Sequence, residues 1–187
     1  MTCKDFNVIE DYKNCTVEEV NRKLRETAFP YAVLMQHIQG DFNIGTVIRN
    51  ANAFNAEKVF YFGNKRYDRR GTVGTHHYTD IQYLTDLDKL RDLKKEYCFI
   101  GVDNTESSES IFDLSWKKLE VTTTRLLQND LRKSLFLFGE ENNGLIPEVL
   151  DMCDVVVHIP QFGSVRSLNV GTASGVVMYE FVKQCTN

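Results

Sequence analysis

Three polar segments of the chain follow apolar runs and contain residue types that could bind or activate a substrate. The first, residues 41–51, reads DFNIGTVIRNA and predicts a helix that Asp41 or Asn43 caps. Residues at helical spacing form its apolar face: Ile44, Val47, Ile48 and Ala51. Arg49 falls on another face, with Gly45 and Asn52, that no core requires. A guanidinium there could stabilise a developing negative charge, whereas a capped helix with a solvated arginine is the alternative for this segment taken alone.

The second segment, residues 135–145, reads LFLFGEENNGL and predicts a buried strand followed by a turn between Gly139 and Gly144. Two carboxylates and two amides lie between these glycines. Such a turn exposes backbone N–H and C=O groups at the carboxyl end of the strand, where they could hold an adenine or a pair of hydroxyls. The alternative is an ordinary polar turn that leads into a helix started by Pro147.

The third segment, residues 155–175, reads VVVHIPQFGSVRSLNVGTASG and predicts a strand, a loop and a helix that continues to about Lys183. Ser167 or Asn169 is placed to cap this helix. Its apolar residues form two stripes, one of Val170, Ala173, Val177 and Phe181 and one of Gly171, Gly175, Met178 and Val182. A helix that is apolar on two sides must be buried twice. We therefore expect one stripe to face the sheet of its own chain and the other to face a partner subunit.

Strand-sized apolar runs alternate with helical patterns along the chain, which predicts an α/β fold with a mostly parallel sheet and helices on both faces. The predicted strands are Tyr31–Ile38, Lys58–Gly63, His77–Leu84, Tyr97–Val102, Ser134–Gly139 and Val155–Pro160. Ligands in such sheets bind at the carboxyl ends of the strands, where the three polar segments begin. The length of 187 residues suits a single domain spanning 1–187, with residues 1–30 as a short N-terminal extension.

The composition indicates a soluble protein of a reducing compartment. No stretch resembles a secretory signal, and the apolar runs are shorter than the roughly 20 residues of a membrane helix. The five cysteines are odd in number and form no CxxC pair, so we expect no disulfide framework and no zinc site. His76 and His77 would point to opposite faces of a strand and could not share a metal. We therefore expect a cytoplasmic protein without a metal and without membrane contact.

The net charge of −4, from 22 Lys and Arg against 26 Asp and Glu, argues against indiscriminate binding of phosphate backbones. Any contact with nucleic acid must be local. The segment KRYDRR, residues 65–70, could supply it through Lys65, Arg66, Arg69 and Arg70. A solvated loop is the alternative for this segment taken alone.

Taken together and in this order, the three segments resemble the three motifs of the SpoU family of SPOUT RNA methyltransferases. The matching residues are Asn43-x-Gly45-x-x-x-Arg49, Gly139-x-Glu141-x-x-Gly144, and Ile159-Pro160 followed by Ser167-Leu168-Asn169-Val170. The resemblance spans about residue 30 to the C-terminus. It implies a C-terminal trefoil knot, S-adenosylmethionine as methyl donor, and a homodimer that completes the active site. The residues implied to bind the cofactor are Asn104, Gly139, Ile159, Leu168 and Ser167.

The resemblance also implies the reaction, which is methylation of a ribose 2'-hydroxyl in RNA. Arg49 matches the family's catalytic arginine. Because a guanidinium stays protonated, we expect Arg49 to orient a phosphate of the target nucleotide and to stabilise the developing alkoxide, while an RNA phosphate accepts the proton. Asn43, Glu141, Ser167 and Asn169 match residues that position Arg49, the cofactor or the ribose. Gln161 stands where the family often has methionine, and Gly171 where serine is common.

The sequence leaves little room for a separate RNA-binding domain, so we expect RNA recognition by the catalytic domain itself. Arg166 in the third segment is a further candidate for RNA contact, beside the basic segment 65–70. A compact folded substrate, tRNA, then fits better than a deep ribosomal site. Ribosomal RNA as substrate, or an RNA-binding module of the same fold without turnover, are the alternatives.

Overall fold

The computed structural model describes residues 3, 7–38, 40–63, 67–114 and 132–186. These residues form a sheet in the order β3-β2-β1-β6-β4-β7-β5, and every described strand pair is parallel. The strands are β1 (Phe29–Gln36), β2 (Ala56–Phe62), β3 (Ile81–Leu84), β4 (Tyr97–Val102), β5 (Glu109–Ser110), β6 (Lys133–Phe138) and β7 (Val155–His158). The α-helices are α1 (Val17–Glu26), α2 (Asp41–Ala53), α3 (Leu87–Asp92), α5 (Pro147–Leu150) and α6 (Val170–Thr186). The prediction of a mostly parallel sheet is confirmed.

Strand β1, in the interior of the sheet, shows why these strands are apolar along their whole length. Tyr31, Val33 and Met35 face one side of the sheet, and Ala32 and Leu34 face the other, all with 0% exposure. Strands covered on both faces read as continuous hydrophobic runs because neither face meets water.

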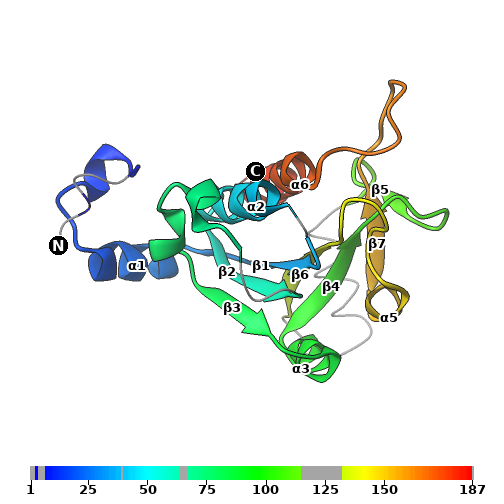
Figure 1. Ribbon diagram of the computed structural model, residues 1–187, viewed down its shortest axis with the longest axis horizontal. Coiled ribbons are helices and arrows are strands. Elements are labelled where there is room, and N and C mark those ends of the chain that lie inside the picture. Colours follow the sequence, from blue (N-terminus) through cyan, green and yellow to red (C-terminus); the bar gives the residue numbers. More distant parts are fainter. Residues whose placement is uncertain (1–2, 4–6, 39, 64–66, 115–131, 187) are drawn as a thin grey trace.

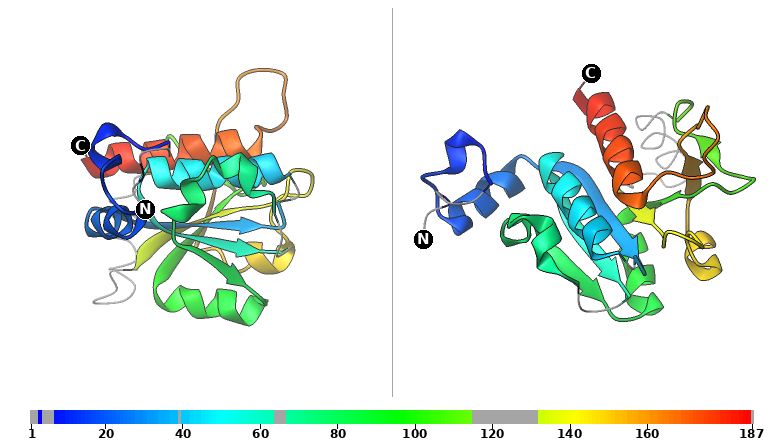
Figure 2. Two further views of the ribbon diagram at one scale, coloured as in Figure 1. Left: turned by 60° about the vertical axis from the view of Figure 1, so that its left-hand side comes forward. Right: turned by 45° about the horizontal axis from the view of Figure 1, so that its top comes forward.

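Helices cover both faces of the sheet, as predicted (Figures 1 and 2). Helices α2 and α6 lie side by side on one face, where Val47 and Phe181 are buried against the sheet. On the other face, Leu90 of α3 and Val149 of α5 are fully buried. The C-terminal trefoil knot stays a prediction.

Helix α6 corrects one expectation, because both of its apolar stripes are covered within the chain. Its neighbour α2 lies against the second stripe, where Asn50 Nδ2 donates to the Gly171 carbonyl at 2.8 Å and to Ser174 Oγ at 3.0 Å. Met178 of that stripe is 0% exposed. The second stripe was expected to face a partner subunit, and that expectation was wrong because α2 of the same chain covers it. The small residues of α6 do allow another helix to approach closely, and that helix is α2.

The N-terminal residues pack beside the sheet and add no described strand to it. Thr16 and Glu19 form a reciprocal capping box at the start of α1, and Val20 packs with Cys3 and Tyr78 in a small separate cluster. This segment reaches away from the carboxyl ends of the strands (Figure 1). Its status as an extension of a single domain stays a prediction. Among the described residues, no helix has both the length and the hydrophobicity that crossing a membrane requires.

Two local predictions were wrong, and one strand was missed. Helix α2 begins at Asp41 and its N-cap is Gly40, without a side-chain cap, because Asn43 lies inside the helix and bonds to residues of other segments. His76 and His77 lie in a 3-10 turn (Thr75–His77) before β3, with ring centroids 4.1 Å apart, so the strand begins later than expected. The short strand β5 was not predicted.

Candidate functional site

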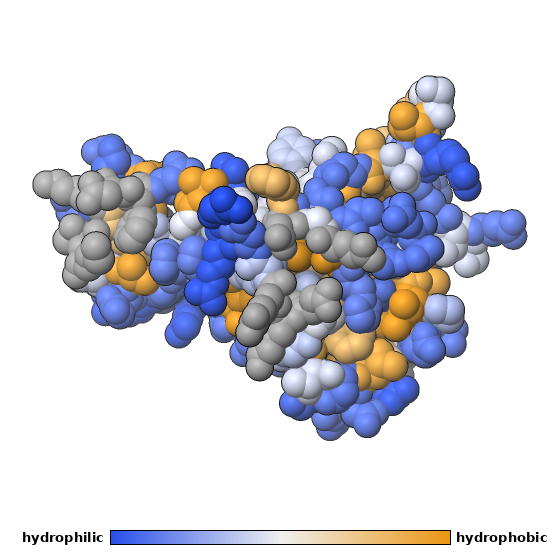
Figure 3. Space-filling view, viewed as in Figure 1, coloured by the Kyte–Doolittle hydropathy of each residue, from blue (hydrophilic) through white to orange (hydrophobic). Residues whose placement is uncertain are grey.

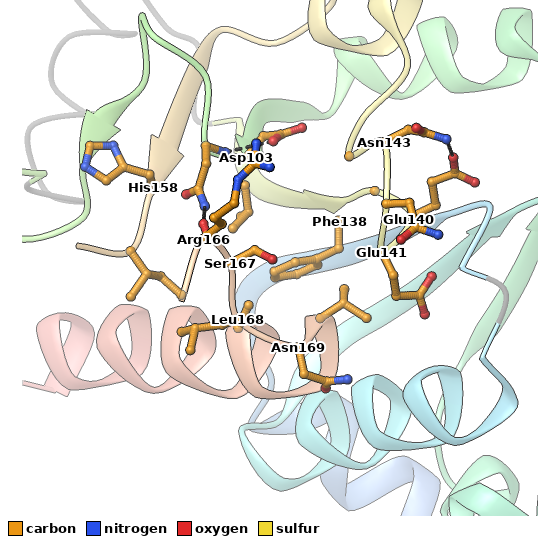
Figure 4. Close-up of a pocket in the computed structure, with 18 of the residues that line it drawn as sticks. Asp103, Phe138, Glu140, Glu141, Asn143, His158, Arg166, Ser167, Leu168 and Asn169 are labelled. Carbon is orange, nitrogen blue, oxygen red and sulfur yellow. Dashed lines mark hydrogen bonds between the residues drawn. The ribbon is translucent and has the colours of Figure 1, made fainter. Parts of the chain in front are cut away.

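The carboxyl ends of β4, β6 and β7 surround a pocket of about 600 Å³ (Figure 4). It is lined by residues 102–104 after β4, by residues 138–144 after β6, and by segments 158–161 and 166–170 on either side of a projecting loop. This is where a parallel α/β sheet binds ligands. The second and third polar segments of the sequence therefore meet at one site.

The turn after β6 forms one wall of the pocket and depends on its two glycines. Glu140 and Gly144 exchange backbone hydrogen bonds of 3.1 and 3.0 Å, which closes a tight antiparallel turn. Gly144 has a φ of +69°, and a β-carbon there would overlap the Asp103 carboxylate. A β-carbon at Gly139 would overlap the backbone of Gly144. A side chain at either position would therefore strain the turn.

Two residues that the sequence analysis missed hold this turn in place. Gln36 at the end of β1 is 0% exposed; its Oε1 accepts from the Ile146 amide at 2.9 Å, and its Nε2 donates to the Gly144 carbonyl at 3.4 Å. Asp103 after β4 accepts from the backbone amides of Leu145 and Asn104 at 2.8 and 2.7 Å. A polar residue at the end of a buried apolar strand was the signal available for both.

One chain of hydrogen bonds joins the three polar segments. Asn43 Nδ2 of α2 donates to Glu141 Oε1 at 2.8 Å, and Asn169 Nδ2 donates to Asn43 Oδ1 at 2.9 Å. Asn169 Oδ1 in turn accepts from the amides of Gly171 and Thr172, so the predicted cap of α6 is confirmed. In each of these hydrogen bonds an N–H group faces an oxygen, which fixes the orientation of the Asn43 and Asn169 side-chain amides.

The structure brings the predicted catalytic and cofactor-binding residues together, except Arg49. The pocket lining includes Asn104, Gly139, Glu141, Ile159, Ser167, Leu168 and Asn169. Asn43 joins the site through its hydrogen bonds. Arg49 is exposed on α2 and does not line the pocket of its own chain.

The predicted RNA-contact residues lie on separate elements. Lys65 and Arg66 are outside the described residues. Arg69 is exposed on the turn that packs against α2. Arg70 pairs with Asp68, and this hydrogen-bonded guanidinium lowers the pKa of the Asp68 carboxyl. Arg166 instead lines the pocket, and its carbonyl accepts from Asn104 Nδ2 at 3.1 Å.

The loop between β7 and α6 stands out from the body of the molecule beside the pocket (Figure 1). Phe162 and Val165 on this loop are 89% and 61% exposed, and apolar and hydrophilic atoms lie together on the projection in the space-filling view (Figure 3). At the base of the loop, His158 Nδ1 lies 3.0 Å from Ser108 Oγ, which itself donates to the Thr105 carbonyl. His158 is therefore held by a hydrogen bond and lines the pocket. Across the described residues, no cluster of three His, Cys, Asp or Glu side chains could hold a metal.

Comparison with known proteins identifies the family. The sequence profile of the SpoU rRNA Methylase family matches residues 30–179. The tRNA (guanosine(18)-2'-O)-methyltransferase of Aquifex aeolicus is 25% identical over 157 residues, which are 81% of this chain and 68% of that protein.

Solved structures share the fold. The A. aeolicus TrmH/SpoU tRNA modifying enzyme superposes with a TM-score of 0.74 at 19% identity, covering 91% of this chain and 84% of the other. An rRNA methyltransferase from Sinorhizobium meliloti with bound AdoMet, which is S-adenosylmethionine, gives a TM-score of 0.70 at 21% identity, covering 88% of this chain and 60% of the other. Because the family profile spans most of the chain and includes all three polar segments, the protein belongs to the SpoU rRNA methylase family.

Proposed function

We propose that this protein transfers a methyl group from S-adenosylmethionine to the 2'-oxygen of a ribose in RNA, with tRNA as the preferred substrate. One observation carries the proposal. The hydrogen-bond chain through Asn43, Glu141 and Asn169 links the three family motifs at the mouth of a pocket. A purely structural role would not require Glu141 and Asn169 in the lining of a cavity, with Asn43 hydrogen-bonded to both.

The pocket fits the proposed cofactor in size and chemistry. About 600 Å³ is within the range of small-ligand sites. Apolar side chains of Phe138, Ile159 and Leu168 offer a surface for the adenine, and the turn after β6 presents backbone groups to it. Carboxylates of Glu140 and Glu141 lie on one side of the pocket (Figure 4), where a positive sulfonium or ammonium would be attracted. When bound, S-adenosylmethionine supplies an electrophilic methyl group.

Arg49 supplies the positive charge that stabilises the ribose 2'-oxygen as it loses its proton. A 2'-hydroxyl is a poor nucleophile until its proton leaves, and a fixed guanidinium stabilises the alkoxide that develops. Arg49 orients the target phosphate, which brings the hydroxyl into line, and an adjacent RNA phosphate accepts the proton. Glu141, Ser167 and Asn169 position the ribose and the cofactor. No step in this mechanism requires a metal.

The position of Arg49 supports a homodimer with a shared site. Because Arg49 is exposed on α2 and does not line its own pocket, we propose that α2 of a second copy delivers it. Phe42 of α2 is 82% exposed, and Val176 and Tyr179 of α6 are 39% and 58% exposed, which leaves apolar area on this helix layer for a partner.

Mixing two inactive variants tests the shared site. Arg49→Ala dimers and Gly144→Ala dimers are each expected to be inactive, but random exchange should restore about a quarter of the wild-type rate, because half of the dimers then hold one intact site of two. No recovery, with subunit exchange verified by sedimentation of size-tagged subunits, would place Arg49 in the site of its own chain.

The substrate proposal rests on the named function of the Aquifex aeolicus relative, which acts on tRNA. The negative net charge requires local RNA contacts, for which we propose Lys65, Arg66, Arg69 and Arg70. All five cysteines are free thiols, which supports work in the reducing cytoplasm. Ribosomal RNA is the alternative substrate, since the S. meliloti neighbour is an rRNA methyltransferase.

Nucleoside mass spectrometry tests the reaction. Purified protein is incubated with S-adenosylmethionine and either tRNA or ribosomal RNA from cells that lack the gene, with Arg49→Ala as the matched variant. We expect a new 2'-O-methyl nucleoside in tRNA, lost in Arg49→Ala while cofactor binding is retained. An Arg49→Ala protein as active as the parent would remove the catalytic assignment, and the absence of any new nucleoside would favour an RNA-binding module.

A further inference from the structure

Negatively charged side chains outnumber positively charged ones in the lining of the pocket. Three carboxylates line it, those of Asp103, Glu140 and Glu141, and all of its lining residues belong to the described part of the chain. Arg166 is the one lining residue with a permanent positive charge. In Figure 4, Arg166 lies on the same side as Asp103, across the pocket from Glu140 and Glu141. The pocket therefore has two electrostatically different sides.

The charge of Arg166 is not neutralised within the described residues. Its guanidinium makes no ion pair with any described carboxylate, and the side chain is exposed to solvent in the pocket. The nearby Asp103 carboxylate accepts two backbone hydrogen bonds that hold the pocket wall. The Asn104 amide binds the Arg166 carbonyl at 3.1 Å, which anchors this end of the projecting loop to the end of β4. A backbone fixed in this way can present the guanidinium to a ligand.

S-adenosylmethionine carries a carboxylate, an ammonium and a sulfonium group, so it needs one cationic partner among several anionic ones. We propose that Arg166 binds the carboxylate of the methionyl part of the cofactor, which reassigns Arg166 from the RNA contact expected from the sequence. The inference rests on the proposed function. A guanidinium presents a planar pair of donors that matches a carboxylate in bidentate geometry. The side with Glu140 and Glu141 is left for the positive groups.

Binding of two ligands that differ only in the carboxylate tests this assignment. Isothermal titration calorimetry compares S-adenosylmethionine with decarboxylated S-adenosylmethionine, for the wild type, Arg166→Gln and Arg166→Lys. Arg25→Gln, on the exposed side of α1, is the matched control for loss of one positive charge. We expect Arg166→Gln to weaken the binding of S-adenosylmethionine about tenfold, the loss of one charge-assisted contact. Its affinity for the decarboxylated ligand should stay the same or rise, and Arg166→Lys should recover part of the loss.

The other outcomes are distinguishable. Equal weakening of both ligands, or no change for either, would overturn the assignment. If Arg166→Gln left cofactor binding intact but lowered RNA affinity and its salt dependence, Arg166 would be an RNA contact after all. A wild-type protein that bound neither ligand would overturn the proposed function itself, not only this inference. Circular dichroism and a thermal melt of each variant exclude misfolding as the cause.

Discussion

Replacing Gln36 should both destabilise the protein and loosen the turn after β6 that forms one wall of the pocket. Gln36 is 0% exposed and makes two hydrogen bonds to the turn after β6, one to the Ile146 amide at 2.9 Å and one to the Gly144 carbonyl at 3.4 Å. Gln36→Leu preserves most of the side-chain volume but leaves a buried N–H group without an acceptor. We expect a loss of about 2 to 3 kcal/mol, combining one hydrogen bond of about 1 kcal/mol with the desolvation of the unpaired amide.

Gln36→Glu is the informative companion because it adds a titratable group at a buried position. The protonated carboxyl can still accept from the Ile146 amide and donate to the Gly144 carbonyl. Burial disfavours the ionised form and raises the pKa of this carboxyl above its unfolded value of about 4.3. The variant should therefore be most stable below the unfolded pKa. It should lose up to about 1.4 kcal/mol for each pH unit as the pH rises toward the folded pKa.

Urea denaturation at pH 6 and pH 8 measures both effects, with the wild type at each pH as reference. Gln36→Leu should lower the free energy of unfolding by about 2 to 3 kcal/mol at both pH values, with little dependence on pH. Gln36→Glu should be about 1 to 3 kcal/mol less stable at pH 8 than at pH 6, after the change in the wild type is subtracted. A Gln36→Glu protein whose stability follows the wild type at both pH values would refute the buried, bridging role of Gln36.

Two further predictions concern the site walls. Gly144→Ala should cost about 2 kcal/mol because it combines a positive φ with overlap on the Asp103 carboxylate, and it should weaken cofactor binding in calorimetry. Gly163→Ala, with nothing near its β-carbon, is the neutral control. Equal stability of the two variants would contradict the expected overlap between the new β-carbon at position 144 and the Asp103 carboxylate. Asn169→Ala should lose about 1 to 2 kcal/mol in urea unfolding through the α6 cap. With Asn43→Ala it should show a coupling of at least about 0.5 kcal/mol in a double-mutant cycle, and strict additivity would argue against the hydrogen bond.

The sequence predicted the interior of the fold well because buried strands have a strong local signal. The predicted strand Tyr97–Val102 matches β4 residue for residue, and β1, β2, β6 and β7 differ from their predicted ranges only at the ends. Strand β5 was not predicted because Glu109 and Ser110 are polar, and their pairing with β7 is a tertiary contact that has no local sequence pattern.

The residues of the site were predictable only in part. Motif residues such as Glu141 and Asn169 could be identified because they recur in a family pattern, whereas Gln36 and Asp103 act through backbone groups of a distant turn. Nothing in the spacing of Gln36 indicates the turn that it holds, 108 residues further along the chain. Helix α6 shows a second limit, since periodicity indicates that a helix face is covered but not whether its own chain or another covers it.

The atom that receives the methyl group distinguishes ribose methylation from methylation of a base. The protein is incubated with tRNA and S-adenosylmethionine that carries a deuterated methyl group, and the digested nucleosides are fragmented in a tandem mass spectrometer. We expect the label to stay with the ribose fragment and the base to be unlabelled. Label on a base, or no labelled nucleoside in any RNA fraction from a protein that is folded and binds the donor, would contradict this expectation.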